Sequence, residues 1–241
     1  MTVDTVILSR CTSAETFEIN KECVRTLIES EPDIRFSIVI VESNKDFAGL
    51  DFSYVQKNVT VIVPDEPFRF HRFLNIGLDH GESETVIFSN NDVRFHPGWL
   101  AEILKVRELN PEIRSFSPFD RNGPYLRHEE FSQKRFHIGY RVPVEFTGWC
   151  FVVDRSVFDQ VGRFDERYGL YFGDNDFART LKRNRILHAM VPSSFVEHHG
   201  GYTTGNYDAS ATPAYARDRE AYIKKWGDTA WRKFCTRFSR I

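Results

Sequence analysis

Short apolar runs of strand length alternate with helical segments in the first part of the chain. One of these runs, Phe36–Val41, is apolar except for Ser37, which is typical of a parallel strand covered on both faces. The other runs lie at residues 5–8, 59–63 and 85–88, and apolar residues recur at helical spacing at 19–28 and 70–78. Because strands joined through helices pair in parallel with right-handed crossovers, the sequence predicts an α/β fold with a mostly parallel central sheet flanked by helices.

The same alternation continues more loosely in the rest of the chain. Further strands are expected at residues 113–117, 145–153 and 186–191, and helices at 99–104, at 156–161 with Ser156 as the cap, and after Asp174. Pro118 to Pro143 has no clear period, and a loop of that length in a compact domain is usually functional or disordered. We interpret it as a substrate-facing insertion. Residues 200–216 are rich in Gly, Thr, Ser and Asn and are expected to be mobile.

Length and composition allow one sizeable core. The chain has 241 residues, of which 41% are hydrophobic, so we expect a single domain over residues 1–241. Charge is nearly balanced, with 32 Lys and Arg against 34 Asp and Glu, so no global field draws the protein to nucleic acid or anionic lipid. A basic tail carries Trp231, Phe234 and Phe238 at helical spacing. This stripe could contact a membrane surface, but a terminal helix packed on the domain explains it better.

Cysteine usage and the amino terminus bear on the cellular compartment. Cys11, Cys23, Cys150 and Cys235 show no metal-ligand spacing and predict reduced thiols. The first residues carry no basic segment, and no long apolar stretch follows. We therefore expect neither a signal peptide nor a transmembrane helix, and a cytoplasmic protein.

Polar side chains follow two of the predicted strands. Asn90, Asn91 and Asp92 end the run that begins at Thr85, and Glu42 ends the run that begins at Phe36. Open α/β sheets bind ligands at the carboxyl ends of their strands. Asn and Asp are also ordinary turn residues, so this pattern alone does not establish a site.

Two more polar clusters occur in the second half of the chain. Asp174 and Asp176 open a predicted helix, whose dipole stabilises an ionised carboxylate that can accept a proton; helix capping is the alternative. His198 and His199 follow the last predicted strand, and an imidazole with a carboxylate suits a divalent ion held partly by phosphates. Simple hydrogen bonding is the alternative for either histidine. A nucleotide-diphosphate donor needs such a metal site, a base for the acceptor and polar strand ends, and the sequence offers all three.

In order and spacing, these motifs resemble those of family 2 glycosyltransferases, which have the GT-A (Rossmann-like) fold. The resemblance runs from Thr5 to about Gly227. Asn90-Asn91-Asp92 is similar to the family's metal motif, and Glu42 to its acidic nucleoside contact. The other matching motifs are Asn75-Ile76-Gly77, Gly148-Trp149-Cys150, residues 161–166, Asp174-x-Asp176 with Arg179, His198 and Lys225-Trp226-Gly227. The chain departs from the family pattern at Gly173, where the family usually has Glu, and at Ser9-Arg10-Cys11, where it usually has Thr-Tyr-Asn.

The resemblance implies a metal-dependent, inverting transfer of a sugar from a nucleotide-diphosphate sugar, with a UDP-sugar as the expected donor. The acceptor would be a hydroxyl of a glycan, lipid, protein or modified nucleobase. Asp174 would be the catalytic base, and Asp92 and His198 would hold Mn²⁺ or Mg²⁺. The implied donor contacts are Ser9, Glu42, Asn75, Asn91 and Asp92, and the implied acceptor contacts are Trp149 and Asp176. Residues 1–96 would form the nucleotide-sugar half, 97–199 the acceptor and catalytic half, and 200–241 a mobile loop and a helical tail.

Other classes of protein remain open at this stage. A sugar nucleotidyltransferase uses a similar sheet, but it needs a Gly-rich phosphate loop after the first strand, and residues 9–15 contain none. A non-catalytic nucleotide-binding or glycan-binding module would bind ligand without turnover. A metal-dependent hydrolase built on His198, His199 and Asp176 is weaker, because the sequence has no second His pair or bridging carboxylate with suitable spacing.

Overall fold

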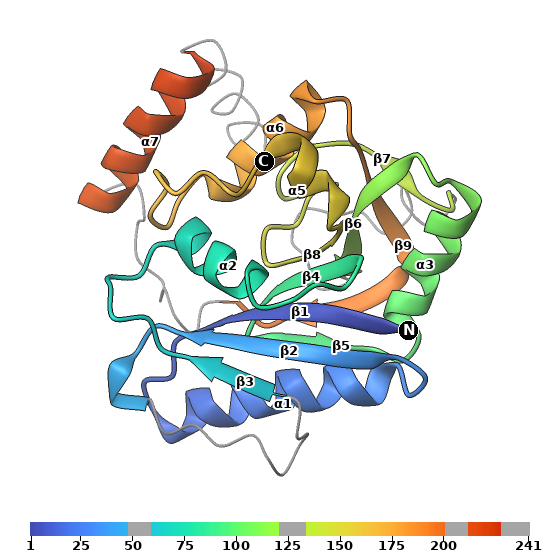
Figure 1. The fold of residues 1–241 in the computed structure, drawn as a ribbon, viewed down its shortest axis with the longest axis horizontal. Helices are drawn as coiled ribbons and strands as arrows, with labels where there is room; N and C mark the ends of the chain where they lie inside the picture. The colour runs from blue at the N-terminus through green and yellow to red at the C-terminus, as the bar shows by residue number, and fades with distance from the viewer. Residues whose placement is uncertain (48–58, 121–133, 201–211, 228–241) are drawn as a thin grey trace.

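The computed structural model describes residues 1–47, 59–120, 134–200 and 212–227. These residues form one nine-stranded sheet with helices packed on both faces (Figure 1). The strands are β1 (Thr2–Ser9), β2 (Arg35–Glu42), β3 (Val59–Ile62), β4 (Thr85–Asn90), β5 (Val93–Phe95), β6 (Ile113–Asp120), β7 (His137–Ile138), β8 (Cys150–Asp154) and β9 (Leu187–His198). The helices are α1 (Ala14–Ser30), α2 (Phe70–Leu78), α3 (Trp99–Leu109), α5 (Ser156–Val161), α6 (Gly173–Arg183) and α7 (Pro213–Trp226), with a short 3₁₀ turn at Lys45–Phe47.

The strands follow the order β3-β2-β1-β4-β8-β6-β9-β5, and β7 pairs with β9. The first four strands in this order are parallel, whereas β8 runs antiparallel to both of its neighbours, β4 and β6. The predicted α/β fold with a mostly parallel central sheet flanked by helices is confirmed. The antiparallel position of β8 was not readable from its sequence, because a buried strand is apolar in either direction.

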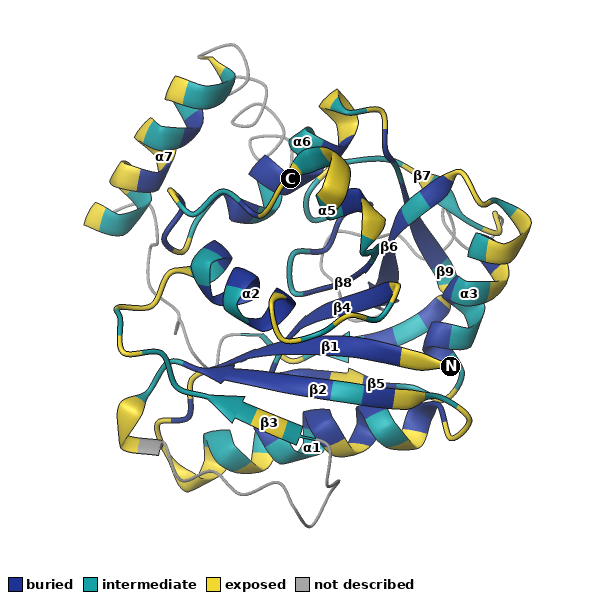
Figure 2. Cartoon of the chain, viewed as in Figure 1, coloured by how far each residue is buried: buried dark blue, intermediate teal, exposed yellow. Residues whose placement is uncertain are grey.

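Each face of the sheet has its own apolar core. In β1, Val3 and Ile7 belong to the core that α1 and α3 cover, whereas Val6 and Leu8 belong to the core that α2, α5 and α6 cover. This division follows from the two-residue period of a strand. Figure 2 shows the central strands buried and the exposed residues concentrated on the outer sides of the helices.

Gly77 allows α2 to lie directly on β1. A Cβ atom at this position would come within 2.2 Å of a Val6 methyl carbon, so only glycine fits without a shift of helix or strand. We expect Gly77→Ala to lower the free energy of unfolding by about 1–3 kcal/mol through overpacking, measured by denaturant unfolding. The double variant with Val6→Ala should lose less free energy of unfolding than the sum of the two single-variant losses, because the methyl groups that clash with the Cβ atom added at residue 77 are gone. An unchanged stability of Gly77→Ala would contradict this account of the packing.

Several predicted boundaries need correction. The strand expected at residues 145–153 begins only at Cys150, because 145–149 form a turn. Arg155, not Ser156, precedes the first residue of α5, and no side chain caps that helix. Residues 213–216 belong to α7 and not to a mobile segment, because the Thr212 side chain accepts a hydrogen bond from the Tyr215 N–H and Pro213 occupies the first turn.

Some expectations concern other parts of the chain. Residues 121–133 of the expected insertion at 118–143, most of the segment at 200–216 and the stripe at Trp231, Phe234 and Phe238 lie outside the described residues. Cys11, Cys23 and Cys150 are buried free thiols, as expected. Among the helices of the described ranges, none has the length and apolar character needed to cross a membrane.

Candidate active site

The carboxyl ends of β1, β2 and β4 meet at one edge of the sheet. Ser9 is in register with Glu42, and Leu8 with Asn90. The chain leaves β1 through α1 to reach β2 on one side, whereas β4 lies on the other side of β1 and follows α2 (Figure 1). Such a switch point leaves a crevice between the two connections, where open α/β sheets bind their ligands. The two predicted polar strand ends, at Glu42 and at Asn90, therefore lie together with Ser9 at the end of β1.

Glu42 is the centre of a buried hydrogen-bond network at this edge. Its side chain is fully buried and accepts hydrogen bonds from the Ser9 hydroxyl at 2.5 Å, the Cys11 N–H at 3.1 Å and the Asn44 N–H at 2.7 Å. These donors fix the carboxylate between the loop after β1 and the loop after β2. Ser9 and Glu42 are thus brought together as the sequence predicted, and their common role is to hold the two loops in a defined arrangement.

Asn20 also belongs to this network, although no site role was predicted for it from the sequence. Its Nδ2 donates to the Ser9 hydroxyl at 2.6 Å, and Asn91 Nδ2 approaches the same oxygen at 3.5 Å. The Asn20 side chain is fully buried, and its Oδ1 has no hydrogen-bond partner in the described part of the chain. The available signal was its spacing from Cys23 and Leu27, which places a polar residue on the apolar face of α1.

Asp92 and His198 lie next to each other. Asp92 is buried, and its Oδ1 lies 3.3 Å from His198 Nε2. The pairing of β5 with β9 causes this contact, because it sets Val93 opposite His198 and lets the His199 N–H donate to the Asp92 carbonyl at 3.1 Å. The structure therefore selects His198 over the exposed His199 as the neighbour of the carboxylate.

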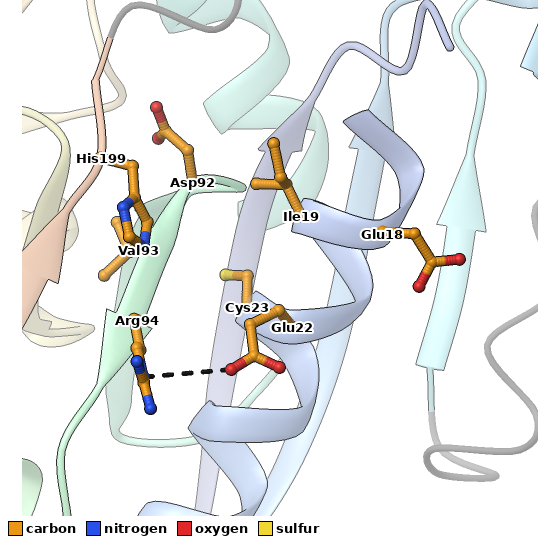
Figure 3. Close-up of a pocket in the computed structure, with 8 residues that line it drawn as sticks. All are labelled: Glu18, Ile19, Glu22, Cys23, Asp92, Val93, Arg94 and His199. Carbon is orange, nitrogen blue, oxygen red and sulfur yellow. Dashed lines mark ion pairs between the residues drawn. The ribbon is translucent and has the colours of Figure 1, made fainter. Parts of the chain in front are cut away.

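A hollow of about 340 Å³ adjoins Asp92 between β5 and α1. Figure 3 shows the Asp92 carboxylate directed away from Arg94, while the His199 ring lies beside Val93. An ion pair between Arg94 Nε and Glu22 Oε1, at 3.9 Å, crosses the hollow. Asp92 thus lines this hollow at the end away from Arg94.

The residues at Asp92 fit a divalent cation. Despite its approach to His198, Asp92 Oδ1 has no hydrogen bond among the described residues, although it is buried. A buried carboxylate oxygen without a donor is costly, and a cation would remove that cost. The described residues contain no group of three or more His, Cys, Asp or Glu arranged to hold a metal. Two protein ligands would leave the remaining positions to phosphate and water, as Mg²⁺ and Mn²⁺ sites often do.

Asp174 is the second residue of α6 and is half-buried. Its Oδ1 accepts hydrogen bonds from the Asn175 N–H at 2.7 Å and from Asn175 Nδ2 at 2.9 Å. Burial raises the pKa of the Asp174 carboxyl above its usual value, although the hydrogen bonds from Asn175 oppose that shift. A carboxylate with a raised pKa is a stronger proton acceptor, which suits a general base.

Trp149 contacts His198 directly. The two rings are stacked, with centroids 4.8 Å apart and an angle of 7° between their planes. One face of the indole is therefore occupied by the histidine, so any acceptor contact would use another part of the ring. Its acceptor role stays a prediction.

Asp176 has a different environment from the one predicted. It is buried, and it accepts hydrogen bonds from the Tyr168 hydroxyl at 3.0 Å, Trp226 Nε1 at 2.7 Å and Lys225 Nζ at 2.9 Å. The same Lys225 ammonium also reaches Asp165 at 2.8 Å. These contacts bind α7 to the start of α6 and give the carboxylate a structural role. Its acceptor role stays a prediction.

We expect Lys225→Met to destabilise the protein by about 3 kcal/mol, because it leaves the charge of the buried Asp176 without its half-buried cationic partner. The melting temperature should fall by roughly 6–12 °C, given about 2–4 °C per kcal/mol for a chain of this size. The matched control is Lys224→Met, since Lys224 is the exposed neighbour on the same helix. Equal melting temperatures for the two variants would show that Lys225 does not hold α7 in place.

Asn75 also has a structural environment. It is buried; its Nδ2 donates to the Phe164 carbonyl at 3.0 Å and to Glu166 Oε1 at 2.9 Å, and its Oδ1 accepts the Phe164 N–H at 3.1 Å. All these contacts are with the loop that leads toward α6. Asn75 therefore supports this loop, and its donor-binding role stays a prediction.

Comparisons with known proteins place the chain in a family. The family described as "Glycosyl transferase family 2" matches residues 17–162, more than half of the chain. A curated relative is the N-acetylglucosaminyl-diphospho-decaprenol L-rhamnosyltransferase of Mycobacterium tuberculosis (strain CDC 1551 / Oshkosh), which is 28% identical over 185 residues. That match covers 64% of this chain and 60% of the relative, so the chain spans less than two thirds of the relative's length.

Solved structures show the same fold. The crystal structure of GalNAc-T7 with UDP, GalNAc and Mn²⁺ has a TM-score of 0.67 at 15% identity, covering 95% of this chain and 49% of that one. Residues 1–349 of TarS from S. aureus give a TM-score of 0.61 at 13% identity, covering 82% of this chain and 60% of that one. The implied GT-A fold is thereby confirmed. With more than half of its length matched by the family and its motifs in the expected order, the chain belongs to glycosyl transferase family 2.

Proposed function

We propose that the protein is a metal-dependent, inverting glycosyltransferase that moves a sugar from a nucleotide-diphosphate sugar to a hydroxyl acceptor. One observation carries this proposal: the buried Asp92 Oδ1 lies 3.3 Å from His198 Nε2, next to the switch point of the sheet, and has no hydrogen bond to any residue that the structure describes. A divalent cation bound by these two residues and by a diphosphate would satisfy that oxygen.

The donor would lie along the carboxyl ends of β1, β2 and β4. Ser9, Glu42 and Asn91 hold the loops that would contact the nucleoside, and Asp92 and His198 would hold Mn²⁺ or Mg²⁺. Such an ion supplies Lewis-acid stabilisation of the leaving diphosphate. A UDP-sugar is the first donor to test, since GalNAc-T7 was crystallised with UDP and Mn²⁺.

Asp174 would act on the acceptor. In a single displacement, the acceptor oxygen forms a bond to the anomeric carbon while the bond from that carbon to the diphosphate oxygen breaks. The acceptor proton passes to the Asp174 carboxylate, and the nucleoside diphosphate leaves with the bonding electron pair. Because attack and departure occur on opposite faces, the product has the inverted configuration. The raised pKa of Asp174 and its place at the start of α6 support this role.

The proposal divides the chain into a donor half, residues 1–96, and an acceptor half, residues 97–199. Ser9, Glu42 and Asp92 come from the first, and Asp174 and His198 come from the second. Residues 200–241 would form a third segment, of which the structure describes Gly200 and 212–227, where α7 packs against the start of α6. For the acceptor, the name of the mycobacterial relative suggests a diphospholipid-linked sugar as the first compound to test. Action in the cytoplasm remains a prediction from the sequence.

The test is a transfer assay with UDP-, GDP- and dTDP-sugars, with and without Mn²⁺, and with diphospholipid-linked N-acetylglucosamine or water as acceptor. We expect release of one nucleoside diphosphate that requires the metal, and a product whose anomeric configuration by NMR is opposite to that of the donor. Binding of a nucleotide sugar without turnover for any acceptor, water included, would instead favour the non-catalytic module. A product with retained configuration would exclude the single displacement.

A further inference from the structure

We propose that the Gly148-Trp149 dipeptide is a positioning element that holds the metal-binding histidine and the catalytic base in one fixed arrangement. This inference rests on the proposed function, because it concerns the roles of His198 and Asp174. Its basis is that the two adjacent residues contact these two functional side chains separately. Trp149 stacks on His198, and Gly148 lies against Asp174.

The sheet itself fixes the position of Trp149. β8 pairs antiparallel with β4, with Cys150 opposite Ser89, and the Trp149 carbonyl accepts the Asn90 N–H at 2.8 Å. The turn before the strand is closed by the Thr147 hydroxyl, which donates to the Cys150 carbonyl at 2.6 Å. Trp149 is thereby attached to the strand that leads directly into Asp92.

The stacked indole orients the imidazole without using either ring nitrogen. A metal-binding histidine is usually oriented by a hydrogen bond from its second nitrogen to a carboxylate or carbonyl group. In the described ranges, the His198 ring has no such bond, and Asp92 is its sole ion-pair partner. The nearly parallel Trp149 ring supplies the orientation instead, since such offset stacking is a favourable geometry for aromatic pairs. Trp149 therefore takes the place of the missing hydrogen-bond acceptor.

Gly148 makes room for the base. A Cβ atom at residue 148 would lie 2.6 Å from Asp174 Cβ and 3.0 Å from Asp174 Oδ2. Any larger residue would push the start of α6 away from β8. The absence of a side chain therefore sets how closely Asp174 approaches the strand that carries Trp149, and with it the spacing between base and metal site.

The first experiment measures Mn²⁺ binding by electron paramagnetic resonance, with and without UDP. Trp149→Leu keeps bulk but has no ring, and we expect about a tenfold loss of Mn²⁺ affinity, as for other groups that orient metal ligands. Trp149→Phe should rescue binding, because a phenyl ring still stacks. His96→Ala is the matched control. Glu197 lies on the same strand as His198, and His96 pairs with it outside the site. It should bind Mn²⁺ like the wild type.

A second measurement does not require the Leu variant to fold. Mn²⁺ bound beside Trp149 should quench tryptophan fluorescence in the wild type, and Trp149→Phe should lose that quenching while still binding the ion. Gly148→Ala should lower kcat and shift the pH profile of transfer, yet leave Mn²⁺ affinity unchanged, because the three atoms nearest to the added Cβ all belong to Asp174.

The outcomes distinguish a failure of the proposed function from a failure of the positioning role alone. A wild type that binds no Mn²⁺, with or without UDP, contradicts the proposed function itself. A wild type that binds Mn²⁺, together with a folded Trp149→Leu variant of equal affinity, overturns only the positioning role. Quenching that persists in Trp149→Phe overturns it as well, because Trp149 would then not be the tryptophan next to the ion.

Discussion

Replacing Asp174 with Asn should lower kcat by about 10² to 10⁴-fold, which is the usual contribution of a general base. Asn has the same shape and can still meet Asn175, but it cannot take the acceptor proton. The affinity for the donor should be unchanged, because Asp174 lies on α6 and not at the strand ends that would hold the nucleotide. The measurement is the steady-state rate of transfer at saturating donor and metal.

Asp159→Asn is the matched control for this prediction. Asp159 is an acidic residue in the first turn of the neighbouring helix α5, but its side chain is exposed. It should keep the rate of the wild type. Near-normal transfer by Asp174→Asn with any acceptor would show that another group is the base.

The raised pKa of Asp174 gives this prediction a pH dependence with a definite sign. Because the folded protein binds the proton more tightly than the unfolded chain, the free energy of unfolding falls as pH rises from the usual Asp value, about 4, through the raised value. Activity changes in the opposite direction, since only the ionised carboxylate accepts a proton. Asp174→Asn should therefore be at least as stable as the wild type at neutral pH, although it is far less active. A loss of melting temperature on this substitution would contradict the assigned cause of the pKa shift.

The sheet and its polar edge were predictable from local patterns. Apolar runs followed by Ser9, Glu42 or Asp92 identify strand ends, and parallel strands joined by helices bring such ends to one edge. The placement of these residues therefore needed only strand period and chain direction. The choice of His198 over His199 needed more, because it depends on the register of β9 against β5.

The structural contacts of Asn75 and Asp176 could not be predicted from the sequence, for a common reason. Both residues belong to motifs shared with the family, but their partners come from distant segments: the loop at Phe164 for Asn75, and Lys225 and Trp226 for Asp176. A motif shows that a residue matters without showing whether it contacts substrate or supports the structure. The same limit applies to Trp149, whose stacking on His198 depends on two separate strand pairings.

Replacing Asp92 with Ala should abolish the stabilisation of the protein by nucleotide and metal together. A ligand at 100 times its dissociation constant stabilises the folded state by about 2.7 kcal/mol, so Mn²⁺ with the correct nucleoside diphosphate should raise the melting temperature of the wild type by roughly 5–10 °C. Asp92→Ala should show no metal-dependent rise, because the remaining ligand, His198, is neutral when it binds a cation. Without ligand, the variant should lose little stability, since the substitution removes a buried carboxylate oxygen that has no hydrogen bond in the described structure.

Asp79→Ala serves as the control for this measurement. Asp79 is an exposed residue at the end of α2 that pairs with Arg163, so its loss should leave the nucleotide-dependent and metal-dependent rise intact. If Asp92→Ala retained the full rise with Mn²⁺, the cation would bind elsewhere, and the unsatisfied oxygen beside His198 would need another explanation. If the wild type showed no rise with any nucleoside diphosphate and Mn²⁺, the strand ends at Ser9, Glu42 and Asn91 would not form a donor site. Because the two results concern different residues, they separate an error in the metal site from an error in the donor site.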